Sequence, residues 1–164
     1  MKDRCAEYLS QSRTAMGSGR YIEAVRCCEE ALKIRPAMAE AHYQLGMCHM
    51  DSNEIDKAKK SFKKAVKLQP ENGEAYFGLG SCYFAKEKYV KALDAFTKAE
   101  KYGCSNKVRK RMYYHMGLIN ERLNNTQGAR YYYDLALSVD NEINADVKNI
   151  LTRQMWIWIR LKNP

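Results

Sequence analysis

This chain of 164 residues contains a repeated pattern of 34 residues. Residues 39–72 align with residues 73–106 without a gap. The positions that match are Leu45 and Leu79, Gly46 and Gly80, Ala58 and Ala92, Phe62 and Phe96, and Ala65 and Ala99. A period of 34 residues is the length of one helix–turn–helix unit. The sequence therefore predicts a stack of helix pairs, and such stacks bind partners more often than they catalyse reactions.

The period extends in both directions. A first unit over residues 5–38 carries Ala24, Ala31 and Pro36 in register, with Cys28 at the Phe62 position. A fourth unit over residues 110–143 lies 37 residues after the third, which places three inserted residues near 105–109. Its matching positions are Gly117, Ala129, Tyr133 and Ala136. Residues 144–161 are long enough for one further helix that caps the stack.

These positions resemble the tetratricopeptide repeat family, whose pattern is W-x2-L-G-x2-Y, then A-x3-F, then P. The second unit fills it with His42, Leu45, Gly46, His49, Ala58, Phe62, Ala65 and Pro70. The resemblance covers almost the whole chain. It implies an all-α, right-handed superhelical solenoid of four antiparallel helix pairs plus a C-terminal capping helix, in one domain over residues 1–164.

The pattern has physical reasons. Glycine in the first helix lacks a β-carbon, so the two helices of a unit can approach closely, and the aromatic residue of the second helix fills the space between units. Pro36 and Pro70 are expected to end second helices, since proline cannot continue the hydrogen-bond ladder. Gly17-Ser18-Gly19 falls at a turn between helices, where glycine permits a positive φ.

Composition narrows the class of protein. No stretch approaches the roughly 20 apolar residues of a membrane helix, and the N-terminus lacks the apolar run of a secretory signal, so we expect a cytoplasmic protein. The six cysteines are interpreted as small core residues in a reducing compartment, since Cys48 and Cys82 share one repeat position. His42 and His49 occupy aromatic positions and are expected to be packed rather than metal-bound.

No sequence motif indicates catalysis. Gly78-Leu79-Gly80 lies inside a predicted helix and follows no strand, so it does not form a phosphate loop. No serine, histidine and aspartate occur in a catalytic motif. We therefore predict a protein that is not an enzyme and needs no cofactor or metal ion.

The resemblance also implies a binding face. In this family the first helix of each unit lines the inner, concave surface, and the matching positions form an apolar lane in which Gly78 and Ser81 leave a dent. A methionine- and aromatic-lined groove suits a peptide or amphipathic helix of a partner protein. The predicted lane consists of Tyr43, Met47, Met50, Phe77, Phe84, Tyr114 and Leu118.

Polar residues extend this prediction. Arg111, His115 and Arg122 in the fourth unit would place acidic residues of a bound segment at that end. Trp156 lies on an otherwise polar face of the last predicted helix and is a candidate anchor for a partner or for self-association. Some members of the family bind the acidic C-terminal tails of chaperones through conserved lysine, arginine and asparagine positions. This sequence does not match those positions, so we do not expect that mode of binding.

The net charge of +9 leaves an alternative function open. Two basic clusters could bind nucleic acid or an anionic membrane, although a solvated outer helix face explains the first cluster more simply. The first cluster is Lys57, Lys59, Lys60, Lys63, Lys64 and Lys67, and the second is Lys107, Arg109 and Lys110. A third possibility is a self-assembling segment of a larger repeat protein.

Overall fold

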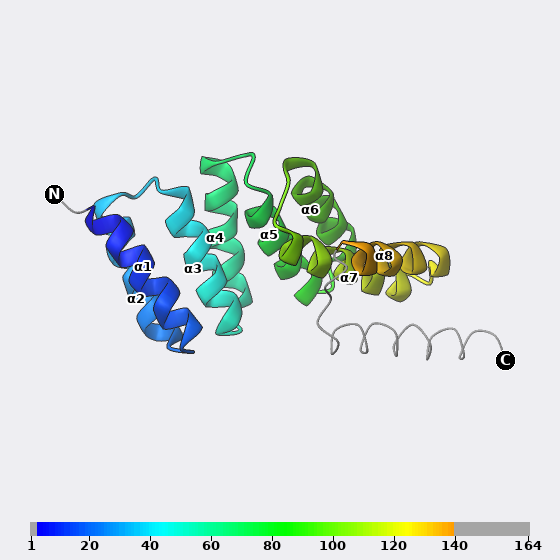
Figure 1. The fold of residues 1–164 in the computed structure, drawn as a ribbon, viewed down its shortest axis with the longest axis horizontal. Helices are drawn as coiled ribbons and strands as arrows, with labels where there is room; N and C mark the ends of the chain where they lie inside the picture. The colour runs from blue at the N-terminus through cyan, green and yellow to red at the C-terminus, as the bar shows by residue number, and fades with distance from the viewer. Residues whose placement is uncertain (1–2, 140–164) are drawn as a thin grey trace. The chain divides into compact units, whose positions relative to one another are not determined.

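The structure is a computed structural model that describes residues 3–139. Those residues form eight α-helices and no strand, which confirms the predicted all-α repeat fold (Figure 1). The helices are α1 (Arg4–Gly17), α2 (Tyr21–Ile34), α3 (Ala39–Asp51), α4 (Ile55–Leu68), α5 (Gly73–Ala85), α6 (Tyr89–Tyr102), α7 (Asn106–Arg122) and α8 (Thr126–Ser138). The predicted capping helix over 144–161 and Trp156 lie outside the described residues.

The chain divides into two compact units at the Gly103–Cys104 boundary. The first unit holds the helix pairs α1–α2, α3–α4 and α5–α6, and the second holds the pair α7–α8. The predicted single domain over residues 1–164 stays a prediction.

The first and second helices of the first unit have different neighbours. The first helices α1, α3 and α5 contact one another in sequence, whereas among the described helices α2 does not contact α4 and α4 does not contact α6. Each second helix instead packs on the first helix that follows it, α2 on α3 and α4 on α5. The first helices therefore form one continuous face, and the second helices are splayed apart on the other.

The turn inside each helix pair has the same form in all four pairs. Gly19, Asn53, Glu87 and Asn124 occupy one repeat position, and all four have a positive φ, between 56° and 71°. The next residue donates its backbone N–H to the carbonyl five residues earlier, as Lys88 does to Tyr83 at 2.9 Å. This is the Schellman arrangement, which satisfies carbonyls at the end of a helix. Gly19 confirms the predicted positive φ.

Helix ends follow the predicted signals. Helices α2 and α4 end two residues before Pro36 and Pro70, as the missing proline N–H requires. Helix α7 has 17 residues where α5 has 13, and both end at the same repeat position, Arg122 and Ala85. The insertion near 105–109 therefore adds about one helical turn to the start of α7.

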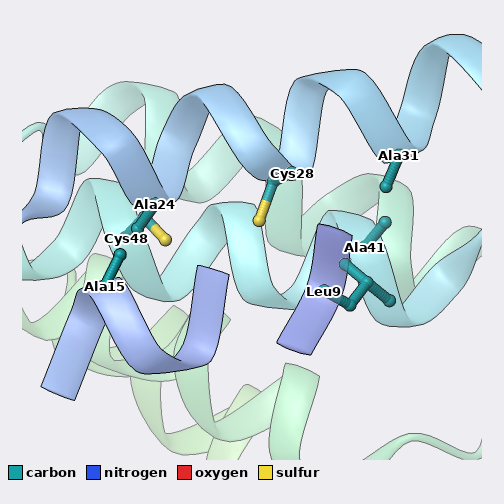
Figure 2. Packing of buried hydrophobic residues seen from close by; sticks show 7 residues of the cluster. All are labelled: Leu9, Ala15, Ala24, Cys28, Ala31, Ala41 and Cys48. Carbon is teal, nitrogen blue, oxygen red and sulfur yellow. The ribbon is translucent and has the colours of Figure 1, made fainter. Parts of the chain in front are cut away.

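Small side chains pack the first pair against α3. Figure 2 shows Ala24, Cys28 and Ala31 on the side of α2 that faces α1 and α3, and all three are completely buried. Because alanine and cysteine are short, the helices can lie close together. The six cysteines are free thiols, and five are buried, which fits the predicted role as core residues.

Candidate protein-binding faces

The face of α3 and α5 carries four of the predicted lane residues with part of their surface accessible. Tyr43, Met47, Met50 and Phe84 are all half-buried. The first three are spaced by four and three residues, so they project from one side of α3. Tyr43, Met47 and Met50 also pack on the core cluster that contains Phe62 and Leu79. These residues therefore combine a packing role with an accessible apolar surface.

Two contacts tie this side of α3 to α5. The Tyr43 hydroxyl donates a hydrogen bond to a Glu74 carboxylate oxygen at 3.1 Å. The Cys82 thiol donates to the Met50 sulfur at 3.4 Å. Phe84 is supported differently, because its ring centroid lies 6.2 Å from that of Tyr89 on α6. Neighbouring helices thus hold Tyr43, Met50 and Phe84 in place, which favours a preformed binding surface.

Two predicted features of the lane differ in the structure. Phe77 exposes only 4% of its surface, and its ring centroid lies 5.8 Å from that of Phe96, so it packs in the core. The predicted dent at Gly78 is filled, because a β-carbon there would lie 2.5 Å from the Phe62 ring. Ser81 is also buried, and its hydroxyl donates to the Phe77 carbonyl at 3.0 Å.

In the second unit, α7 carries the remaining predicted lane residues. Tyr114 and Leu118 are half-buried, and the Tyr114 ring centroid lies 5.9 Å from that of Tyr133 on α8. Arg111 and Arg122 are exposed. Burial, with a smaller effect of Arg111, lowers the pKa of His115 to about 4, so this side chain is neutral at pH 7. Of the three residues predicted to attract acidic groups, Arg111, His115 and Arg122, only the two arginines are therefore charged at pH 7.

The basic residues of α4 divide into paired and unpaired sets. Lys57 contacts Glu54 at 2.6 Å, and Lys59 contacts Asp56 at 3.2 Å. The exposed lysines with no ion pair in the described part of the chain are Lys60, Lys63, Lys64 and Lys67. In the second cluster Lys107 is exposed, Lys110 is half-buried, and the Arg109 guanidinium donates to the Cys104 carbonyl at 3.4 Å. Most of the lysines of α4 are therefore exposed to solvent.

One surface feature was missed by sequence reasoning. Hollows of about 480 Å³ and about 420 Å³ lie between α2 and α4, and His42 and His49 of α3 line one each. The sequence signal was the presence of histidine at the two positions where the third repeat has Tyr76 and Tyr83. The two histidines are buried, as predicted.

Comparisons with known proteins agree with this architecture. Sequence profiles of the tetratricopeptide repeat match residues 15–65, 49–106 and 110–143. Among curated protein sequences none matches the chain. No helix within residues 3–139 is both long and apolar enough to cross a bilayer.

Several solved structures have a similar fold. A crystal structure of MamA is 29% identical, with a TM-score of 0.68, and the match covers 79% of this chain and 74% of that one. The Pseudomonas aeruginosa protein pilF is 17% identical, with a TM-score of 0.79 over 98% of this chain and 77% of that one. An O-GlcNAc transferase mutant from Thermobaculum terrenum is 19% identical, with a TM-score of 0.63, and the match covers 90% of this chain but only 25% of that protein.

The repeat profiles, the eight paired helices and the shared turn geometry define the class. The chain belongs to the tetratricopeptide repeat family. It has the general character of a protein-interaction scaffold, in which stacked helix pairs present extended faces to a partner.

Proposed function

We propose that this protein is a non-catalytic adaptor, and that the face of α3 and α5 binds a peptide or amphipathic helix of a partner protein. The observation that carries the proposal is the continuous face of contacting first helices, on which Tyr43, Met47, Met50 and Phe84 remain partly accessible. Methionine and aromatic side chains adapt to apolar partners and commonly supply most of the binding energy at such faces.

The flanking charges suggest an orientation for the bound segment. Glu74 accepts from Tyr43 beside the apolar residues, and Glu40 lies 3.9 Å from Arg13 at the α1 side. A partner segment that buries aliphatic residues on the methionines and keeps acidic residues away from Glu74 would be complementary to this face. Helix α7 carries its own apolar and basic residues, and their participation stays a prediction.

Selection of displayed peptides on the wild-type protein tests this function, followed by affinity measurements on variants. Met47→Lys places a charge on the half-buried face, and we expect it to weaken selected peptides at least tenfold, since a desolvated ammonium opposes an apolar anchor. Val90→Lys makes the same kind of change at a position on α6 that is 77% exposed, and it serves as the matched control.

The two variants are first compared with the wild type by circular dichroism and thermal unfolding. Binding that Met47→Lys and Val90→Lys leave equally strong would contradict the proposed face. Failure to select any peptide on the wild type would contradict the proposed adaptor function itself.

A further inference from the structure

The second helices of the first unit leave a crevice on the side opposite the proposed binding face. Because α2 and α4 do not contact each other while both pack on α3, the gap between them has α3 as its floor. Ile22, Val25, Glu29 and Leu32 are spaced by three, four and three residues, so they line one side of α2. The two hollows take their lining from this stripe, the first three residues at one end and Leu32 at the other.

The floor of the crevice carries two imidazole rings. His42 and His49 occupy the positions of Tyr76 and Tyr83 in the next repeat. There the Tyr76 ring stacks on Tyr102 of α6, with centroids 5.5 Å apart. An imidazole is smaller than a phenol ring, and the His42 Nε2–H is held by the Pro36 carbonyl at 3.0 Å. The ring therefore stays at the floor and leaves room above it.

The end of the crevice near the C-termini of α2 and α4 combines apolar and basic groups. Its hollow of about 480 Å³ is lined by Leu32, Pro36, Ala37, His42, Lys64, Lys67 and Leu68. Leu68 is 42% exposed although it is a large aliphatic residue. Burial lowers the pKa of His42, and the nearby Lys64 adds to this effect, so His42 is neutral at pH 7. The charge of the hollow therefore comes from its two lysines.

We propose that this hollow is a second docking site, which binds a peptide segment of a partner protein that carries a leucine-like side chain beside an acidic residue. The aliphatic side chain would lie between Leu32 and Leu68 above His42, and the carboxylate would lie against Lys64 and Lys67. Neither lysine has an acidic partner in the part of the chain that the structure describes, so a carboxylate supplies the missing charge.

The apolar lining is what selects a peptide over other anions. A nucleic acid brings phosphates but no aliphatic side chain to fill the hollow, and its affinity rests on counterion release at an open basic surface. An anionic bilayer presents a broad interface, whereas these apolar residues lie inside a crevice between two helices. A peptide supplies both the side chain and the carboxylate within a few ångströms.

An array of synthetic 12-residue peptides tests the site, with one central leucine flanked by zero to three glutamates and a second set flanked by lysines. The strongest peptide is then labelled with fluorescein, and its affinity is measured in solution by anisotropy. Lys64→Glu with Lys67→Glu is expected to weaken it at least tenfold. His42→Tyr introduces the larger residue found at the same position of the next repeat, and it should weaken binding to the same degree without any change of charge.

The matched control is Lys98→Glu with Lys101→Glu, because these residues stand 34 positions later on α6, beside the floor that Tyr76 fills. We expect this control, and Met47→Lys on the opposite face, to change the affinity less than twofold. The proposal is overturned if no glutamate-flanked peptide binds, if His42→Tyr leaves the affinity unchanged, or if the α6 control weakens it equally. Binding of duplex DNA or phosphatidylserine vesicles that competes with the peptide and survives His42→Tyr would also overturn it.

Discussion

The first and second repeats fill the space between their helices differently. The second repeat has its large side chain on the second helix, whereas the first repeat has a small one there. In the second repeat the large Phe62 ring lies where β-carbons at Gly46 and Gly78 would come within 2.7 Å and 2.5 Å of it. In the first repeat the same position holds Cys28, and the position of Gly46 holds Ser12, whose hydroxyl lies 3.1 Å from the Cys28 sulfur. A small second-helix residue is thus matched by a larger first-helix residue.

The following first helix continues this exchange. Gln44 on α3 stands at the position that Gly78 has on α5, and it is only 4% exposed. The hydrogen bond with Cys48, together with burial, raises the pKa of the Cys28 thiol, which therefore remains protonated. Interior packing leaves little unfilled volume. The comparison indicates that these two repeat interfaces keep a similar total side-chain volume across three positions, although the residue at each position differs.

Phe62 is expected to contribute more to stability than Cys28 at the same repeat position. Phe62→Ala should reduce the free energy of unfolding by about 4 kcal/mol, because it leaves a ring-sized cavity beside two glycines that cannot fill it. Cys28→Ala removes one sulfur and should cost about 1 kcal/mol. Urea denaturation of both variants measures the difference. Equal losses would mean that the two interfaces are not organised around these residues.

The exchange of volume predicts a rescue. Cys28→Phe alone should destabilise the protein by about 2 to 3 kcal/mol, because the ring meets the larger side chains of the first interface. Adding Ser12→Gly and Gln44→Gly recreates the arrangement around Phe62 and should recover about half of that loss. The recovery is partial because two glycines within helices each cost about 1 kcal/mol. The same two glycine substitutions without Cys28→Phe are the control, and they should only destabilise.

The position of Gln44 and Gly78 holds a titratable residue in α7, His115. Its pKa of about 4 lies below the ordinary value of 6.5, so protons bind the unfolded chain first as the pH falls. Stability due to the neutral ring is therefore complete above pH 6.5 and is lost between pH 6.5 and 4. We expect a loss of about 1 to 2 kcal/mol from pH 7 to pH 5, after allowance for the partial exposure of the ring.

His115→Gln tests this assignment, because glutamine is the residue at the same position of α3 and does not titrate in this range. The unfolding free energy of the wild type minus that of the variant should fall steadily from pH 7 to pH 5. A difference that stays constant with pH would contradict the lowered pKa.

Much of the fold could be predicted from the sequence because the repeat positions encode it. The 34-residue period predicts the helix pairs, Pro36 and Pro70 predict helix ends, and the insertion near 105–109 lies at the start of α7. These features depend on local backbone chemistry, and the same residue types recur at the same positions of the repeats. Family membership followed from the same positions.

The candidate surfaces were harder to predict. A repeat position gives the side of a helix on which a residue lies, but not the depth of its side chain. Phe77 and Tyr43 share one position, yet Phe77 is buried against Phe96 while Tyr43 remains half-accessible. The crevice beside His42 was missed because it depends on the separation of α2 and α4, a tertiary property that no single repeat contains.

The four turns share one geometry but differ in the residue at the positive-φ position. Glu87 adopts a φ of 56°, a conformation that glycine reaches without steric cost, and glycine occupies the same position in the first turn. Its carboxylate also lies just beyond the C-terminal end of α5, where negative charge is unfavourable. Glu87→Gly should therefore raise the free energy of unfolding by about 0.5 to 1 kcal/mol in urea denaturation, while Gly19→Ala should lower it by a similar amount. If backbone strain alone acts, the two variants should change the free energy of unfolding in opposite directions at any salt concentration. If the stabilisation by Glu87→Gly disappears in high salt, the effect is due to charge at the helix end.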